Sequence, residues 1–235
     1  MNPDTAKQIV DKVVGQVFGY QNPLSLDQVL AKFAFDIRLP QQVYDIATNE
    51  PTWAQSVNPS KFIKFENTHN PQIRQEGFYD RPKRPINSIE DILGYWAETN
   101  EMSAERYLDS LNVAESDDVR HSENVFRSQN IENSKNIVFT DGAVNTEFIV
   151  ASQRCQSSTF CIRLEDSGEC SNSFSVTWSN KISNSLFIQD CANMQDCMFC
   201  SHMNSKQYCI ANMQFTEEEY KHYRDMVIRW ILTSQ

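Results

Sequence analysis

Glycine, long apolar runs and basic residues are scarce in this chain of 235 residues. There are only six glycines, and neither a Gly-rich phosphate-binding motif nor a GxSxG motif occurs. No apolar run reaches the roughly 18 residues that a membrane-spanning helix needs. The N-terminus also lacks the basic start and apolar run of a secretion signal. These absences argue against nucleotide hydrolysis and nucleophile-elbow chemistry, and we expect no membrane partner.

The chain carries 21 basic residues against 31 acidic ones, a net charge of −10, and its pI is about 4.9. Such a surface repels phosphate backbones, so we expect no nucleic-acid partner. All seven cysteines lie between residues 155 and 209. An odd number of cysteines without an export signal favours reduced thiols in a reducing compartment such as the cytoplasm.

Asparagine is abundant, and its distribution exposes a repeat. Twelve of the twenty asparagines lie between residues 112 and 212, and asparagine suits tight corners because it tolerates left-handed backbone. In the same stretch a polar residue followed by an apolar anchor recurs every 11 to 14 residues. The anchors are Val113, Val125, Ile137, Phe148, Phe160, Phe174, Leu186, Cys197 and Tyr208.

The anchors predict short strands. In the later copies the residue two positions after the anchor is also apolar, as in Phe148/Val150 and Phe160/Ile162, and a period of two indicates strands with these side chains on one face. Only Asp141-Gly142 resembles a hairpin turn, so stacked coils are favoured over hairpins. We therefore predict a mainly β fold, a right-handed parallel β-solenoid over about 110–212.

Three coil lengths are compatible with the repeat. If every other anchor begins a new coil, the coils are 22 to 26 residues long and number four to five. The anchors and the residues two positions after them would then fill the interior. A coil of about 12 residues is disfavoured because so narrow a tube could hardly hold Phe148, Phe160 and Phe174. A left-handed hexapeptide coil is the third option. It is suggested by an apolar residue at every sixth position, namely Val113, Val119, Val125, Ile131 and Ile137.

The chain divides into an α-rich region with a few short strands, residues 1–110, and the solenoid with a C-terminal capping helix at 217–233, residues 111–235. Helices are predicted over 4–18, after Pro23 and over 88–99, the last with a buried apolar stripe. That stripe consists of Ile89, Ile92, Leu93 and Trp96. Strands are predicted over 35–39 and 61–65. The basic cluster Arg81, Lys83 and Arg84 is interpreted as a solvated loop, with internal pairing to acidic neighbours as the alternative.

Two groups of residues could carry chemistry. The first group is Cys191, Cys197, Cys200, His202 and Cys209, which could bind zinc, although structural thiols are favoured and no metal or cofactor is expected. The second group contains the carboxylates expected at corners of different coils, together with Arg163. These carboxylates are Asp141, Glu165, Asp166, Asp190 and Asp196. Because they do not converge as glycosidase carboxylates do, an enzyme is not favoured.

An apolar stripe is expected on the outside of the solenoid, and Trp53 is a candidate recognition anchor in a loop. The predicted stripe consists of Val138, Cys161, Phe187 and Cys209. Such a surface must be covered, either by the N-terminal helices or by a protein partner or a second copy of the chain.

With these repeats, residues 110–235 resemble the β-helix modules of bacteriophage particles and other assemblies. The resemblance implies a non-enzymatic structural or protein-binding component of a larger assembly, cytoplasmic or in a virion. A carbohydrate-active β-helix enzyme, a polysaccharide hydrolase or lyase, is the alternative, but it rests on fold alone.

Overall fold

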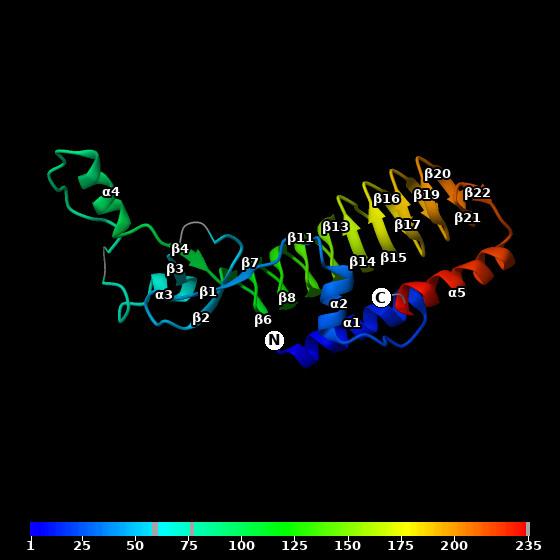
Figure 1. Ribbon diagram of the computed structural model, residues 1–235, viewed down its shortest axis with the longest axis horizontal. Helices are drawn as coiled ribbons and strands as arrows, with labels where there is room; N and C mark the ends of the chain where they lie inside the picture. The colour runs from blue at the N-terminus through cyan, green and yellow to red at the C-terminus, as the bar shows by residue number, and fades with distance from the viewer. Residues whose placement is uncertain (58–60, 76–77, 234–235) are drawn as a thin grey trace.

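A computed structural model describes residues 1–57, 61–75 and 78–233 and shows a long parallel β-solenoid with helices along one side (Figure 1). The solenoid makes about nine turns, which confirms the predicted fold class. Its strands are β5 (Tyr107–Leu108), β6 (Leu111–Ala114), β7 (Asp117–Arg120), β8 (Glu123–Phe126), β9 (Gln129–Glu132), β10 (Lys135–Val138), β11 (Asp141–Val144), β12 (Glu147–Val150) and β13 (Gln153–Gln156). They continue with β14 (Thr159–Glu165), β15 (Ser171–Thr177), β16 (Asn180–Ser183), β17 (Leu186–Gln189), β18 (Ala192–Gln195), β19 (Met198–Ser201), β20 (Asn204–Gln207), β21 (Cys209–Ile210) and β22 (Met213–Gln214).

Each coil is twelve residues long and usually contributes two strands. Parallel pairing places Val125 beside Ile137, Ile137 beside Ile149 and Ile149 beside Cys161, so every residue lies next to the one twelve positions later. The prediction of 22- to 26-residue coils was therefore wrong, and the twelve-residue alternative is the observed one.

A coil this short is possible because the large aromatic residues do not enter it. Phe148, Phe160 and Phe174 pack on the outside, where they contact the helices. The interior instead takes every third residue, so the prediction that anchors and their second neighbours fill the tube was also wrong. Along these interior positions apolar residues alternate with hydroxyl-bearing ones, so apolar residues recur every six, as in the series that begins at Val113. This series continues inside through Cys161 and shifts by three positions at Leu164.

The period of three arises from the backbone. Every third residue from Asn112 to Ala211 has a positive φ, including Gly142 at 84°. Left-handed backbone is costly for most side chains and least so for Gly, Asn and Asp. Nine of these positions are Asn and four are Asp, which explains the asparagine content of the repeat.

Serine and threonine hydroxyls occupy the interior positions between the apolar side chains, and they form hydrogen bonds with the backbone. The N–H of Ser128 donates to Oγ of Ser116 one coil earlier (3.1 Å), and the N–H of Thr140 donates to Oγ of Ser128 (3.0 Å). Oγ of Ser128 in turn donates to the carbonyl of Phe126 (2.8 Å). We call these stacked interior hydroxyls the serine ladder; they are Ser116, Ser122, Ser128, Ser134, Thr140, Thr146, Ser152, Ser158, Ser167, Ser173, Ser179 and Ser185.

Three helices cover one outer face of the solenoid: α1 (Pro3–Phe18), α2 (Leu26–Phe33) and α5 (Glu217–Thr233). Beneath them lies an apolar column with one residue per coil. This column consists of Phe126, Val138, Val150, Ile162, Phe174, Leu186 and Met198, all buried. Phe174 contacts Phe18 of α1 and Phe33 of α2, with ring centroids 5.3 and 5.4 Å apart. The expectation that N-terminal helices cover an outer apolar face is confirmed.

The C-terminal helix folds back from the last coil, as predicted, but it lies along the side of the solenoid and not over its open end (Figure 1). Tyr220 packs against Tyr208 (5.8 Å between centroids), and Arg224 donates to the carbonyl of Val17 at the end of α1 (2.7 Å). The terminal strand β22 pairs antiparallel with β21 and ends the parallel stack.

The N-terminal region adds two small sheets before the first coil. One pairs β1 (Gln41–Tyr44) with β2 (Pro51–Ala54), and the other pairs β3 (Phe62–Lys64) with β4 (Met102–Ala104), next to the short helix α3 (Phe65–Thr68). The strand at β3 is confirmed, but the predicted strand over 35–39 is wrong. There the chain turns after α2, with the N–H of Ile37 bonded to the carbonyl of Ala34 (3.2 Å), and Phe35 lies against Arg163.

Helix α4 (Ile89–Ala97) has the predicted position and capping box but not the predicted burial. Ser88 accepts from the N–H of Asp91, and Asp91 accepts from the N–H of Ser88. No residue of α4 is buried, and the helix stands apart from the other elements (Figure 1). The prediction that its apolar stripe is buried was therefore wrong. No helix in the described ranges is long and apolar enough to cross a membrane.

Candidate binding surfaces

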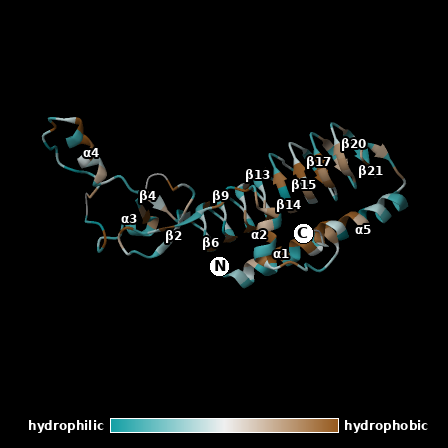
Figure 2. Ribbon diagram, in the orientation of Figure 1, coloured by the Kyte–Doolittle hydropathy of each residue, from teal (hydrophilic) through white to brown (hydrophobic). Residues whose placement is uncertain are grey.

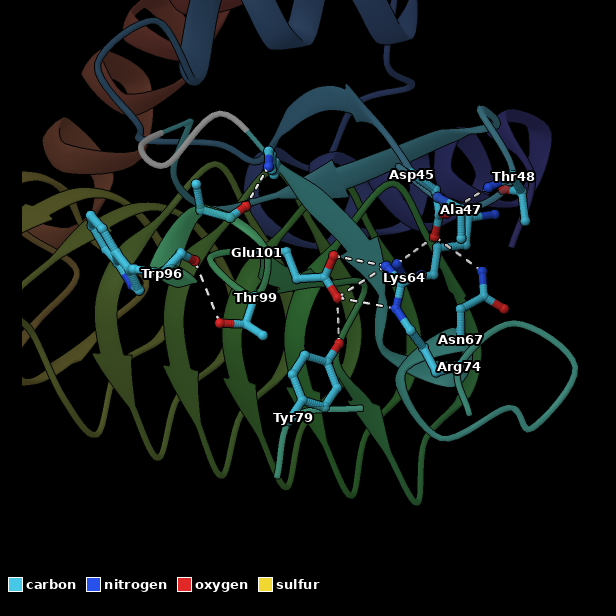
Figure 3. Close-up of polar contacts among 12 residues, drawn as sticks. Asp45, Ala47, Thr48, Lys64, Asn67, Arg74, Tyr79, Trp96, Thr99 and Glu101 are labelled. Atoms are coloured by element: carbon cyan, nitrogen blue, oxygen red, sulfur yellow. Dashed lines mark hydrogen bonds and ion pairs between the residues drawn. The ribbon is translucent and has the colours of Figure 1, made fainter. Parts of the chain in front are cut away.

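The base of the α4 arm, residues 69–75 and 78–101, is fixed by polar contacts to the small sheets (Figure 3). Nζ of Lys61 donates to the carbonyl of Ala97 at the end of α4 (2.6 Å), next to the β3–β4 pair. Arg74 forms a two-pronged ion pair with Glu101 (2.8 and 3.1 Å), and Tyr79 donates to the same carboxylate. A cation at the C-terminal end of a helix is also favoured by the helix dipole.

A nearby buried carboxylate stabilises the loop beside these sheets. Asp45, which is 1% exposed, accepts hydrogen bonds from the N–H groups of Ala47, Thr48 and Lys64 and from the side chain of Asn67 (Figure 3). Burial by itself raises the pKa of Asp45, but these hydrogen bonds outweigh it and lower the pKa overall.

The loop that leads into α4 is clamped to the far end of the helix. Arg84 pairs with Glu98 (3.2 Å) and lies 3.8 Å from the ring centroid of Tyr95. Arg81 also pairs with Glu98, and the hydroxyl of Tyr95 donates to the carbonyl of Pro85 (3.0 Å). Two arginines of the predicted solvated cluster are thus paired internally, and they fold the arm into a defined unit.

The clamped arm presents apolar side chains to solvent. Its exposed residues, called the α4 stripe, are Ile89 (59%), Ile92 (44%), Leu93 (52%) and Trp96 (58%). In Figure 2, α4 carries hydrophobic (brown) segments and has no neighbouring element. Monomeric proteins seldom leave such a cluster uncovered, because its hydration is unfavourable.

A second exposed apolar row lies on the outer face of α5. This α5 stripe consists of Tyr223 (39%), Met226 (55%) and Trp230 (55%). The opposite face of the helix holds Ile228 and Ile231, which are buried against the solenoid and α1. The α5 stripe therefore stays largely exposed after the helix has packed, although Tyr223 contacts Phe215 (5.8 Å between ring centroids) and Trp230 contacts Phe187 (6.0 Å).

The solenoid carries an open groove on β11, β13, β16 and β18, with a volume of about 1030 Å³. One side is formed by Arg154, Asp166, Trp178, Asp190 and His202, which recur every twelve residues. Trp178 is 57% exposed, and its Nε1 donates to Asp166 (3.3 Å). Gly168 and Ala192 keep the floor of the groove low.

Ionisable side chains in the groove contact each other in pairs. Arg154 donates to both carboxylate oxygens of Asp166 (2.6 and 2.7 Å), and this contact holds the pKa of Asp166 below its usual value. Asp190 lies 3.6 Å from Nδ1 of His202. Asp166 is thus an ionised acceptor at neutral pH, which does not suit it to donate a proton. Arg163, the other cation considered for catalysis, is engaged elsewhere by Asp36 (2.7 Å).

The structure does not bring the predicted outer stripe together. Cys161 and Cys209 face the interior, and Val138 is fully buried beneath the helices. Phe187 is outside but stacks on Phe199 (4.6 Å) and contacts Trp230 (6.0 Å). Their expected position on one outer surface was wrong, because the true period is three rather than two.

Trp53 lies in β2, where the small sheets meet the first coils. Its half-buried ring is 5.5 Å from the guanidinium of Arg127, and its carbonyl accepts the N–H of Glu105 (3.1 Å). These contacts join the N-terminal region to the solenoid, and a role of Trp53 in binding stays a prediction.

All seven cysteines are free and point into the solenoid. His202 lies outside it, with a side chain 75% exposed, so the zinc alternative lacks a common centre for its ligands. In the described part of the chain, no three His, Cys, Asp or Glu residues are placed to hold a metal ion. Burial raises the pKa of Cys155 to about 12 and that of Cys170 to about 11.

Two cysteines extend the serine ladder. The N–H of Met203 donates to Sγ of Cys191, and the N–H of Cys209 donates to Sγ of Cys197, both at 3.4 Å. The thiols occupy positions that hydroxyls hold in earlier coils, which supports their structural interpretation. A sequence signal for this existed, since all seven cysteines fall on one phase of a three-residue period.

The comparisons with known proteins bring no relative. The chain matches no family model, no curated protein and no solved structure. The proposed function therefore rests on the α4 stripe, the α5 stripe and the groove of the chain itself.

Proposed function

We propose that this chain is a non-enzymatic structural or protein-binding component of a larger assembly, of which a virion is one example. The observation that carries the proposal is the α4 stripe, a row of apolar side chains on a capped and clamped helix at one tip of a long solenoid. The helix is formed before any partner arrives, which lowers the entropic cost of binding.

The solenoid supports this role as a spacer. Its coils stack through continuous backbone pairing and the serine ladder, and one face is covered by helices. Such a scaffold holds a terminal docking element at a fixed distance from the opposite end. Tryptophan, here Trp96, is also one of the residue types that most often anchor protein interfaces.

The proposal can be tested by purifying the tagged chain from its native cells. We expect a protein in fixed ratio to the chain, either another species or further copies of the chain itself. It should be lost with Leu93→Glu and kept with Leu111→Glu, since Leu111 is also exposed (70%) but lies in the first coils. A wild-type chain that elutes alone and as a monomer would contradict the proposal.

The groove favours a second candidate, a carbohydrate-active protein. An exposed Trp178 between two carboxylate-bearing coils resembles a surface on which a sugar ring stacks and forms hydrogen bonds. A glycosidase also requires a carboxyl group that keeps its proton, whereas Asp166 has a lowered pKa. Turnover of a polysaccharide that disappears with Asp166→Asn or Asp190→Asn would favour this candidate over the assembly role.

A further inference from the structure

We infer that the partner of the α4 stripe is the α5 stripe of a second copy of this chain, so that copies join head to tail. The inference rests on the proposed function and specifies its partner. Three observations carry it: the spacing of the two stripes, their charges and their positions in the molecule.

The two stripes have the same spacing. In α4, Ile89, Ile92 and Trp96 stand at positions i, i+3 and i+7, and in α5, Tyr223, Met226 and Trp230 do the same. Seven residues of helix rise about 10 Å, so the two rows match in length. Rows of this spacing on two helices pack side by side, with the ridges of one in the grooves of the other.

The charges around the stripes are complementary. Helix α4 contains Glu90 and Asp91 and no basic residue, a net charge of −2. Residues 223–233, which hold the α5 stripe, contain Arg224, Arg229 and Asp225, a net charge of +1. Lys221 is paired with Glu217, and with Glu218 and Glu219 the whole helix has a net charge of −1. Two α4 helices would therefore repel each other, whereas the part of α5 that holds the stripe attracts α4.

Antiparallel packing fits these charges best. It places Ile89 opposite Trp230 and Trp96 opposite Tyr223, and it brings Glu90 close to Arg229. The side chain of Arg229 is 69% exposed and pairs with Asp225 within its own helix (2.9 Å), so it lies at the edge of the stripe. The arrangement also places the N-terminus of α4 beside the C-terminal turns of α5, as helix dipoles favour.

The positions of the two stripes decide whether they can meet within one chain or only between copies of the chain. The α4 arm lies at one tip of the molecule, and α5 begins at the opposite end of the solenoid (Figure 1). One chain cannot satisfy its own stripes, and a contact between two different patches is heterologous. Copies then add in one direction and form a filament or, if the rotation closes, a ring. Two short helices bury less than about 1,200 Å², so we expect association in the micromolar range.

The test uses the full-length chain in analytical ultracentrifugation over a range of concentrations. We expect the mean mass of the wild type to rise with concentration, and Leu93→Glu and Met226→Glu to remain monomers. Both positions are exposed, so folding should be unaffected, and thermal unfolding checks this directly. Leu111→Glu is the matched control, an exposed apolar residue outside both stripes, and should associate like the wild type.

Mixing the two monomeric variants gives the sharpest result. Leu93→Glu retains a working α5 stripe and Met226→Glu a working α4 stripe, so the mixture should form one-to-one dimers and nothing larger. In a separate pair, Glu90→Arg and Arg229→Glu should each weaken association about tenfold or more, and the double variant should restore it.

Each contrary result has its own meaning. If Met226→Glu still associates while Leu93→Glu does not, α4 binds a copy of itself and the inference is overturned. A wild type that is monomeric at every concentration also overturns it. The proposed function would survive that second result if a different protein is purified with the chain and lost with Leu93→Glu.

Discussion

At the scale of single residues, the interior of the solenoid is specified by small polar side chains as much as by apolar ones. Ser128 accepts the N–H of Thr140 from the next coil and donates to Phe126 in its own coil, at 0% exposure. A buried hydroxyl with both bonds satisfied costs little to bury, whereas its removal leaves the N–H of Thr140 without an acceptor. The carbonyl of Phe126 keeps its bond from the N–H of Phe139 (3.1 Å). The ladder therefore fixes the register between successive coils.

The serine ladder gives the first prediction. Ser128→Ala should lower the free energy of unfolding by about 1–3 kcal/mol, because the N–H of Thr140 loses its buried acceptor. Ser128→Cys should cost less, since Cys191 and Cys197 accept the same bond in later coils. Urea unfolding measures both, with Ser157→Ala as the exposed control. Equal stability of Ser128→Ala and the control would show that the ladder does not stabilise the coils.

The thiols give the second prediction. All seven cysteines are at most 4% exposed. Burial raises the pKa of Cys161 well above its ordinary value, whereas the hydrogen bond with Cys197 lowers the pKa of Cys200 to about 7, so burial alone protects that thiol. A thiol-specific reagent such as DTNB should therefore modify none of them quickly in the native protein and all seven once the chain is unfolded. Rapid reaction of one or more thiols before unfolding would contradict their interior position.

Much of the fold could be predicted from residue patterns, but which residues face the interior of the solenoid could not. The solenoid, the helices and their caps follow from spacing and capping residues, which act locally. The interior residues depend on a left-handed conformation at every third position, and Phe148 or Arg154 at such positions gives no local sign of it. In the sequence, only asparagine indicated the left-handed positions. The assumed period of two placed Cys161 on the outside of the solenoid, whereas it lies in the interior.

At the scale of elements, junctions decide where the chain is rigid. Asp117, fully buried at the start of β7, accepts from Nε of Arg106 (3.0 Å) and from the N–H of Gln55 (3.0 Å). It thereby joins the segment after β2 to the first coils. The exposure of α4 could not be predicted from its sequence. An apolar stripe indicates that a helix packs against another surface, but it does not show whether that surface belongs to the same chain.

The junction gives the third prediction. Asp117→Asn should lower the free energy of unfolding by about 3 kcal/mol, because it leaves the half-buried Arg106 without its counter-charge. The neighbouring Asp118→Asn is the control, and it should cost less than about 1 kcal/mol because its partner Arg120 is exposed. Chemical denaturation measures both variants. Similar losses for the two would show that burial of the Asp117 pair has no special importance.

At the scale of the whole molecule, two kinds of carboxylate affect stability in opposite directions as pH changes. The pKa of Asp45 is lowered by its hydrogen bonds, so its stabilising contribution is present at neutral pH and is lost as pH falls through the lowered value. Burial raises the pKa of Glu105 and of Glu115 near the first coils. Their contribution is present below the ordinary pKa of glutamate and is lost as pH rises through the raised value.

These opposite signs give the fourth prediction. Stability should pass through a maximum on the acidic side of neutral pH, because the net charge of −10 adds repulsion as pH rises further. Glu105→Gln removes the cost of ionising a buried group, so the variant should be more stable than the wild type at pH 7 and no more stable at pH 4. Glu132→Gln, at an exposed position, controls for the change in net charge. Unfolding midpoints measured from pH 4 to 8 decide the matter, and an equal gain for the two variants at pH 7 would assign the effect to net charge instead of burial.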